Sequence, residues 1–197
     1  MGKRVVWILV ILSVNRLAAQ QGFGDCILKA LTNIDSTVGD TLYNSLKWQE
    51  CVLNKPMPAV NFQTVSGEKV RLARLKGEVI VLNFWFTACP PCLAEIPALN
   101  RLVREYKKKR VRFFGITYDS EKTLKAIFFP KYKFDFSIVS DRKSLTDQFS
   151  AGYPTTYIID RKGIIRAVWT GAFTGDEATE GAFRKAKPVI DALLAEE

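Results

Sequence analysis

The chain has 197 residues, of which 48% are hydrophobic and 25% are charged, a length that fits one domain with a sizeable core. Its net charge of +9 is of the kind found in proteins that bind nucleic acid or anionic membranes. However, the densest basic run, Lys107–Arg110, stands where a helix should end, and cations there offset the helix dipole. We therefore expect no nucleic-acid partner.

The first residues have the pattern of a secretory signal peptide. Lys3 and Arg4 precede ten apolar or small residues, Val5–Val14, and small residues follow up to Ala19. An uncleaved membrane anchor is the alternative, but ten helical residues span only about 15 Å, roughly half a hydrocarbon core. We expect residues 1–19 to be removed, which takes away three basic residues and no acid and lowers the charge from +9 to +6. The mature protein would then be periplasmic or secreted, with no stable membrane span.

Residues 20–54 are predicted to form an N-terminal extension with loosely helical apolar spacing. The segment contains Cys26 and Cys51. In an oxidising compartment these cysteines are candidates for a structural disulfide, which would stabilise the fold by about 3.5 kcal/mol on a loop-entropy estimate. Two free or transiently paired thiols are the alternative.

Residues 55–197 are predicted to form one domain of alternating strands and helices. Apolar runs indicate strands, spacings of three and four residues indicate helices, and Gly-containing turns separate hairpin strands. Thr174 and Glu177 have the spacing of a capping box, which predicts the start of a closing helix. The predicted elements are a hairpin at 62–72, strands at 78–85 and 111–117, helices at 90–108 and 121–129, a strand at 136–140, a helix at 143–149, hairpin strands at 155–160 and 164–169, and a helix at 174–195.

Cys89-Pro90-Pro91-Cys92 stands at the junction between the strand at 78–85 and the helix that follows. Two residues in the first helical turn bring the sulfurs within bonding distance, and the helix N-terminus favours a thiolate on the first cysteine. We interpret Cys89 as the attacking thiol and Cys92 as the resolving thiol. A purely structural bridge would add little stability because its loop is short. A zinc site would need two further ligands, and the chain has no histidine.

Two segments carry a resemblance to a known family. The pattern Trp85-x-x-x-Cys89-Pro90-Pro91-Cys92-x-x-Glu95-x-Pro97 resembles the active-site segment of TlpA/ResA-like thiol–disulfide oxidoreductases, and Gly152–Asp160 is similar to the family's Gly-x-Pro-Thr-Thr segment. The resemblance runs from about residue 55 to the C-terminus. It implies an α/β thioredoxin-like fold, with a central mixed β-sheet flanked by helices and preceded here by the N-terminal extension.

The resemblance also implies roles for residues around the dithiol. In this family the proline matching Pro154 is cis and faces the dithiol, which would leave the Tyr153 backbone free to pair with a substrate. Glu95 matches a family glutamate and is a candidate acid/base for Cys92, with an exposed helix carboxylate as the alternative. Trp85 is expected beside the substrate site. Asn83 stands where ordinary thioredoxins carry a buried acid, so its proton-relay role would pass to Glu95.

We therefore predict an extracytoplasmic enzyme that exchanges dithiols and disulfides with protein substrates, without cofactor or metal. The resemblance favours reduction, including reduction in cytochrome c maturation, supplied by a membrane or periplasmic electron donor. A disulfide oxidase or isomerase is the main alternative. A peroxidase would need Pro and Thr or Ser where Leu82 and Phe86 stand, and copper delivery would need a histidine. A non-catalytic binding module would be expected to lack a cysteine or the proline.

Overall fold

Five strands form one mixed sheet at the centre of the described chain, in the order β5-β4-β3-β6-β7. The computed structural model describes residues 23, 25–26, 46–150, 152–171, 177 and 179–196. β3, β4 and β5 are parallel to one another. β6 pairs antiparallel with β3, and β7 pairs antiparallel with β6. β1 and β2 form a separate antiparallel hairpin. The strands are β1 (Asn61–Gln63), β2 (Lys69–Arg71), β3 (Val79–Trp85), β4 (Val111–Thr117), β5 (Ser137–Val139), β6 (Thr155–Ile159) and β7 (Ile165–Thr170).

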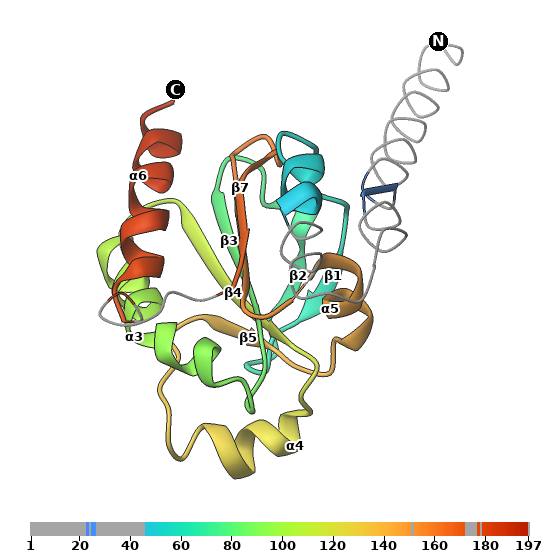
Figure 1. The fold of residues 1–197 in the computed structure, drawn as a ribbon, viewed down its shortest axis with the longest axis vertical. Helices are drawn as coiled ribbons and strands as arrows, with labels where there is room; N and C mark the ends of the chain where they lie inside the picture. The colour runs from blue at the N-terminus through green and yellow to red at the C-terminus, as the bar shows by residue number, and fades with distance from the viewer. Residues whose placement is uncertain are drawn as a thin grey trace.

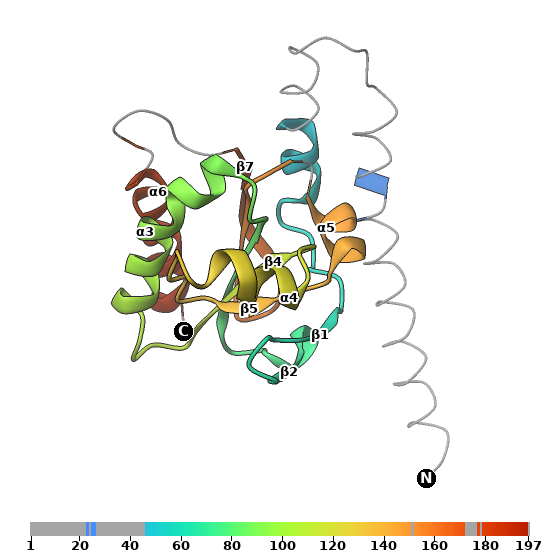
Figure 2. The same ribbon diagram turned by 90° about the horizontal axis from the view of Figure 1, so that it is seen from below.

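Helices cover both faces of this sheet. In Figures 1 and 2, α3 and α6 lie on one side, and α5 lies on the other side together with the helical residues 46–52. The helices are α3 (Pro90–Glu105), α4 (Glu121–Thr123), α5 (Lys143–Phe149) and α6 (Gly181–Ala195), with the short 3₁₀ segment η1 (Leu72–Arg74) and the π-helical segment η2 (Leu124–Phe128), which continues α4. A crossover helix such as α3 is what a parallel pair such as β3 and β4 requires.

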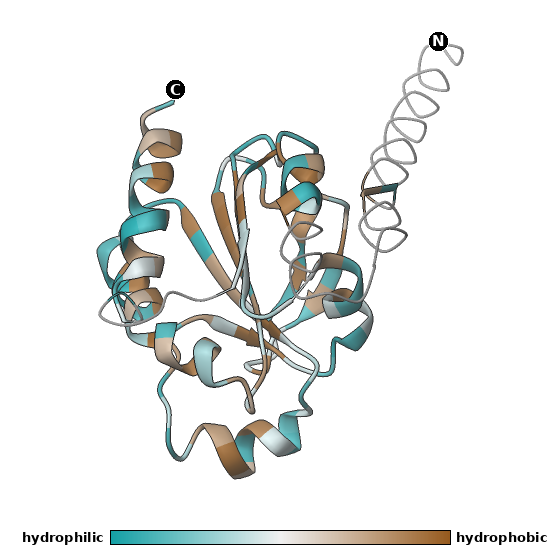
Figure 3. Ribbon diagram, in the orientation of Figure 1, coloured by the Kyte–Doolittle hydropathy of each residue, from teal (hydrophilic) through white to brown (hydrophobic). Residues whose placement is uncertain are grey.

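The central strand β3 divides the interior into two cores. All of its residues are buried, as expected for a strand covered on both faces. Val81 and Trp85 pack in the core under α3 and α6, whereas Leu82 and Phe84 pack in the core under α5. Figure 3 shows hydrophobic residues along the central strands. The alternation of side chains along a strand therefore positions β3 between two apolar layers.

The predicted fold class is confirmed, and most predicted elements agree with the observed ones within a few residues. The exception is the closing helix, which was expected to start at Thr174. Thr174 lies outside the described residues, and α6 begins at Gly181, beyond Glu177. Within the described residues, no side chain caps this helix. The predicted start is therefore wrong, because a capping-box spacing records local preference only, and the contact of the helix with the sheet decides where it begins.

The N-terminal extension is attached to the α5 face of the sheet. A disulfide joins Cys26 to Cys51, and Phe23 and Trp48 are almost fully buried. The Phe23 ring lies 4.9 Å from that of Phe149 in α5, and the Trp48 ring lies 5.8 Å from that of Tyr157 in β6. These residues of the extension therefore belong to the core under α5. The predicted signal peptide, residues 1–19, lies outside the described residues.

Candidate active site

A disulfide between Cys89 and Cys92 stands where β3 passes into α3, with an S–S distance of 2.01 Å. Cys89 is the N-cap of α3, and its Sγ accepts a hydrogen bond from the Cys92 backbone N–H at 3.2 Å. Pro90 and Pro91 occupy the first helical turn, where their missing N–H groups leave no intrahelical bond unmade. The backbone N–H of Cys92 and the helix dipole would stabilise a thiolate on Cys89 after reduction.

The loop before Cys89 is held by a carboxylate from the neighbouring strand end. The backbone N–H of Thr87 donates to Asp119 Oδ2 at 2.6 Å, and Thr117 Oγ1 donates to the same oxygen at 3.1 Å. The backbone N–H of Cys89 in turn donates to the carbonyl oxygen of Phe86 at 3.2 Å. Asp119 was not identified from the sequence. Its position two residues after the end of β4, which is parallel to β3, is the signal that points to it, because the carboxyl ends of parallel strands lie at the same edge of a sheet.

The peptide bond between Tyr153 and Pro154 is cis. Phe84 pairs with Thr155 in the β3–β6 register, so Pro154 lies at the end of β3 from which the chain continues to Cys89. The Tyr153 ring contacts the Phe86 ring at 5.1 Å, edge to face. Both side chains pack against the core that contains the disulfide. The two segments that resembled the family are thus brought to one end of the sheet.

Glu95 is fully buried on α3, one turn after Cys92. Burial raises the pKa of Glu95 from 4.5 to about 8, and a hydrogen bond from Asn83 opposes that rise. In this bond Asn83 Nδ2 donates to Glu95 Oε1 at 2.8 Å. Glu95 is therefore not the exposed helix carboxylate that was the alternative. A carboxyl group that titrates near neutral pH beside the second cysteine is suited to proton transfer.

Trp85 is buried in the core that contains the disulfide. Its side chain is 1% exposed and lies between the rings of Phe128 and Phe134, at centroid distances of 4.5 and 5.5 Å. Gly115 in β4 leaves room for it, since a Cβ atom there would lie 3.0 Å from Trp85 Nε1. Trp85 was expected beside the substrate site, and a direct contact with a substrate stays a prediction. Its indole packs beneath the site, because the alternation of β3 turns it into the core.

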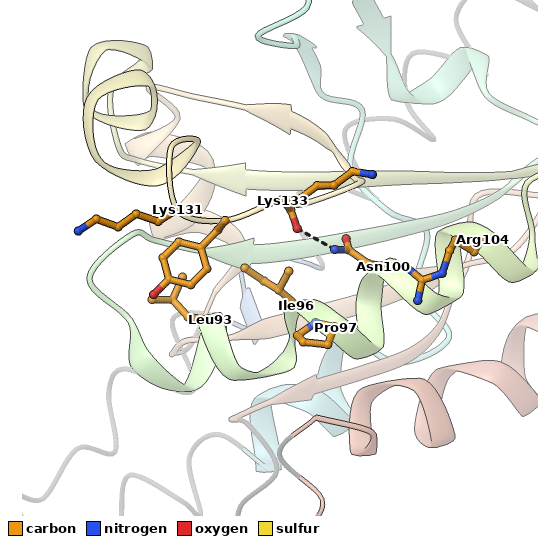
Figure 4. Close-up of a pocket in the computed structure, with 8 residues that line it drawn as sticks. Leu93, Ile96, Pro97, Asn100, Arg104, Lys131 and Lys133 are labelled. Atoms are coloured by element: carbon orange, nitrogen blue, oxygen red, sulfur yellow. Dashed lines mark hydrogen bonds between the residues drawn. The ribbon is translucent and has the colours of Figure 1, made fainter.

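A groove of about 420 Å³ lies along the outer side of α3, beginning at Leu93, the residue after Cys92. Figure 4 shows Ile96 and Pro97 of α3 on one side of the groove, and Lys131 and Lys133 of the loop between η2 and β5 on the other. Asn100 holds this loop to the helix, because its Nδ2 donates to the Lys133 carbonyl oxygen at 2.7 Å. The groove therefore combines an apolar wall with a basic rim next to the dithiol. The full set of lining residues is Leu93, Ile96, Pro97, Asn100, Arg104, Lys131, Tyr132 and Lys133.

Within the described residues, no three Cys, Asp or Glu side chains gather closely enough to hold a metal ion. Over the same part of the chain, no helix has both the length and the apolar character needed to cross a bilayer.

Residues 53–168 match the AhpC/TSA family. The thioredoxin-like protein YneN of Bacillus subtilis is 37% identical over 145 residues, covering 71% of this chain and 85% of that protein. The thiol-disulfide oxidoreductase ResA of Halalkalibacterium halodurans is 32% identical over 151 residues, covering 75% and 86% of the two chains.

Solved structures show the same fold. StoA from Bacillus subtilis superposes with a TM-score of 0.51 at 25% identity, over 61% of this chain and 92% of that one. A thiol:disulfide interchange protein from Bacteroides sp. reaches a TM-score of 0.57 at 21% identity, over 74% and 93% of the two chains. The chain therefore belongs to the AhpC/TSA family of thioredoxin-fold proteins and, within it, to the ResA-like thiol–disulfide oxidoreductases.

Proposed function

We propose that this protein reduces disulfides of other proteins outside the cytoplasm through Cys89 and Cys92. The Cys89 thiolate attacks one sulfur of a substrate disulfide, forming a mixed disulfide and releasing one substrate thiolate. Cys92, deprotonated by Glu95, then attacks the Cys89 sulfur, which releases the second substrate thiolate and forms the Cys89–Cys92 disulfide. Two electrons pass to the substrate, and a partner dithiol protein returns the pair to the reduced form.

The observation that carries this proposal is the position of Glu95. The carboxyl group is fully buried one helical turn from Cys92, and its pKa of about 8 allows it to accept a proton near neutral pH. A structural disulfide needs no such group. Burying a carboxyl group costs stability, so its presence here is better explained by a role in the chemistry of the dithiol. The chain has no histidine that could act in its place.

The direction of electron flow is tested by the reduction potential of the Cys89–Cys92 pair, measured by equilibration in glutathione and then dithiothreitol buffers. We expect a value near that of thioredoxin, about −270 mV. A value near about −120 mV would make the protein a disulfide-forming oxidase and contradict the proposed direction. A pair that does not titrate reversibly would contradict redox catalysis itself.

The surface beside Pro154 is the proposed substrate-binding surface. The rings of Phe86, Tyr118 and Tyr153 contact one another there at centroid distances of 5.1 to 6.0 Å, and Tyr118 is 39% exposed. We propose that a substrate segment pairs with the Tyr153 backbone and rests an apolar side chain on these rings. Disulfides of apocytochrome c are the proposed substrates by analogy with the family, and reduction of a disulfide-bonded apocytochrome c by the reduced protein tests this choice.

The proposed location follows from residues 1–19, whose basic start and short apolar stretch have the pattern of a cleaved signal. We expect the exported protein to begin near Gln20. N-terminal sequencing of the protein purified from the periplasmic or secreted fraction measures this directly. A protein that retains Val5–Val14 and sediments with the membrane would instead be anchored.

A peroxidase is less well supported than a disulfide reductase, although both chemistries occur on thioredoxin-like folds. The pattern of a peroxidatic site places Thr or Ser three residues before the cysteine and Pro four residues earlier still. Phe86 and Leu82 occupy these positions, and Leu82 is buried in β3. Neither position carries the residue that this pattern requires, and Phe86 offers no hydroxyl to a peroxide bound at Cys89.

A further inference from the structure

Three buried polar side chains from different elements form one hydrogen-bonded chain next to the dithiol. Asn83 in β3, Glu95 in α3 and Thr156 in β6 are 1%, 0% and 0% exposed. Asn83 Nδ2 donates to Glu95 Oε1 at 2.8 Å and to Thr156 Oγ1 at 3.0 Å. The register places Asn83 directly opposite Thr156, so the sheet itself sets the second contact.

This geometry fixes the orientation of the Asn83 amide. Both of its N–H bonds are used, one by Glu95 Oε1 and the other by Thr156 Oγ1. An amide turned by 180° would place its carbonyl oxygen against Oε1, which is repulsive whenever Glu95 is ionised. In this orientation Thr156 Oγ1 accepts the second Asn83 N–H bond, which helps to hold the donor side of Asn83 toward Glu95.

The orientation of Asn83 in turn decides which oxygen of Glu95 carries the proton. Oε1 accepts a hydrogen bond in both protonation states, so the proton of neutral Glu95 resides on Oε2. Among the described residues, Oε2 is buried and has no hydrogen-bond partner. Glu95 and Cys92 are three residues apart on α3, and side chains at this spacing are neighbours on a helix surface.

The titratable groups around Glu95 are few in the described part of the chain. Cys92 lies on its own helix and Cys89 is the N-cap of that helix. The neutral side chain of Asn83 reaches Glu95 from β3 and contacts Thr156 of β6, and Gly115, which pairs with Asn83 in β4, carries no side chain. On α6, the Lys185 ammonium lies 5.1 Å from the centre of the Trp169 ring. Trp169 is in β7 and pairs there with Thr156 of β6. Burial and the Asn83 hydrogen bond alone account for the altered pKa of Glu95.

We propose that Thr156 and Asn83 are positioning residues for proton transfer: Thr156 orients the Asn83 amide, Asn83 holds Glu95 Oε1, and Oε2 exchanges the proton with Cys92. In the resolving step the Cys92 thiol loses its proton to the Glu95 carboxylate, giving a thiolate and a neutral carboxyl group. The reverse transfer occurs when the dithiol is regenerated. This inference rests on the proposed function and adds two residues to its machinery.

The test follows the resolving step directly. The reduced protein is mixed with 5,5′-dithiobis(2-nitrobenzoate), so that the first thionitrobenzoate released reports attack by Cys89 and the second reports resolution by Cys92. The rate of the second release is measured from pH 5.5 to 9.5. Cys92→Ser, which lacks the resolving thiol, provides the baseline with no second release.

Thr156→Val removes the hydroxyl but keeps the shape of the side chain. We expect the apparent pH midpoint of the second release to rise by about half a unit, with a loss of about threefold in rate at pH 7, because ionised Glu95 is less well stabilised. Asn83→Ala removes the donor itself and should raise the midpoint by about one unit, a loss of about tenfold at pH 7. Thr156→Ser, which keeps the hydroxyl, should restore the wild-type midpoint.

Thr155→Val is the matched control. Thr155 is equally buried on β6, but its hydroxyl bonds to the Gly152 carbonyl oxygen at 2.7 Å and not to Asn83. Its substitution tests the loss of a buried hydroxyl and should leave the pH midpoint in place, whatever it does to stability. If Thr156→Val does not fold, Thr156→Ala removes the same oxygen with a smaller side chain and should give the same shift.

Two results separate this inference from the proposed function. Wild-type protein that shows no second release contradicts the proposed function itself. Wild-type protein that resolves normally, with a midpoint that Thr156→Val and Asn83→Ala do not raise, overturns the positioning role and leaves the function intact. An equal shift in Thr155→Val would also overturn it, since any buried hydroxyl would then suffice.

Discussion

Replacing Cys89 with serine is expected to abolish disulfide reduction, with a loss of about a thousandfold or more, because the attacking thiolate is removed. The fold should survive this change. Cys89 is the N-cap of α3, and serine is among the preferred N-cap residues, so its oxygen can accept the Cys92 N–H bond that Sγ accepts now. The assay is the rate at which the reduced protein reduces a disulfide-bonded protein substrate, with circular dichroism to confirm folding.

Cys92→Ser provides the matched comparison. It retains the attacking thiol, so we expect the first step to proceed and a mixed disulfide between Cys89 and the substrate to accumulate. That adduct is detected by mass spectrometry and is released by dithiothreitol. If Cys92→Ser failed to form it and Cys89→Ser formed it instead, the assignment of attacking and resolving thiols would be reversed.

The second large effect is a fall in stability with rising pH, caused by Glu95. Its pKa is about 8 in the folded protein against an ordinary 4.5, so above pH 4.5 the unfolded chain binds fewer protons than the folded one. The stability contributed by neutral Glu95 is fully present below about pH 4.5 and is lost as the pH rises through about 8. The total loss is on the order of 5 kcal/mol, at about 1.36 kcal/mol per pH unit.

Glu95→Gln isolates this effect, since glutamine has the same shape, stays neutral and can still accept the Asn83 hydrogen bond. The free energy of unfolding of both proteins is measured in guanidinium chloride at several values between pH 5 and 9, with the disulfides intact. We expect the wild-type values to fall relative to the variant up to about pH 8 and to run parallel above it. The chain has no histidine, so no imidazole titrates in the pH range of this measurement. Parallel curves throughout would mean that Glu95 is not buried as a neutral acid.

The sequence by itself determined the features that depend on residues close together along the chain. The apolar run Val79–Trp85 predicts a buried strand, and the two prolines with their flanking cysteines predict a helix start with the sulfurs in reach of each other. The hairpin at Ser66–Gly67 and the helix Lys143–Phe149 were predicted for the same reason. Such features follow from local propensity, capping and side-chain periodicity, which require no knowledge of the rest of the fold.

The tertiary structure alone decided which side chains meet. Asn83 and Thr156 are 73 positions apart and touch only because β3 pairs with β6 in one register. The burial of Glu95 depends on α3 lying against that sheet, and with it the shift of its pKa toward neutrality. Trp85 faces the core and α6 begins at Gly181 for the same reason, since packing against distant elements outweighs local preference. The dithiol could thus be located from its own sequence, and the resemblance pointed to Glu95, whereas the burial of Glu95 and its link through Asn83 to Thr156 came only from the tertiary structure.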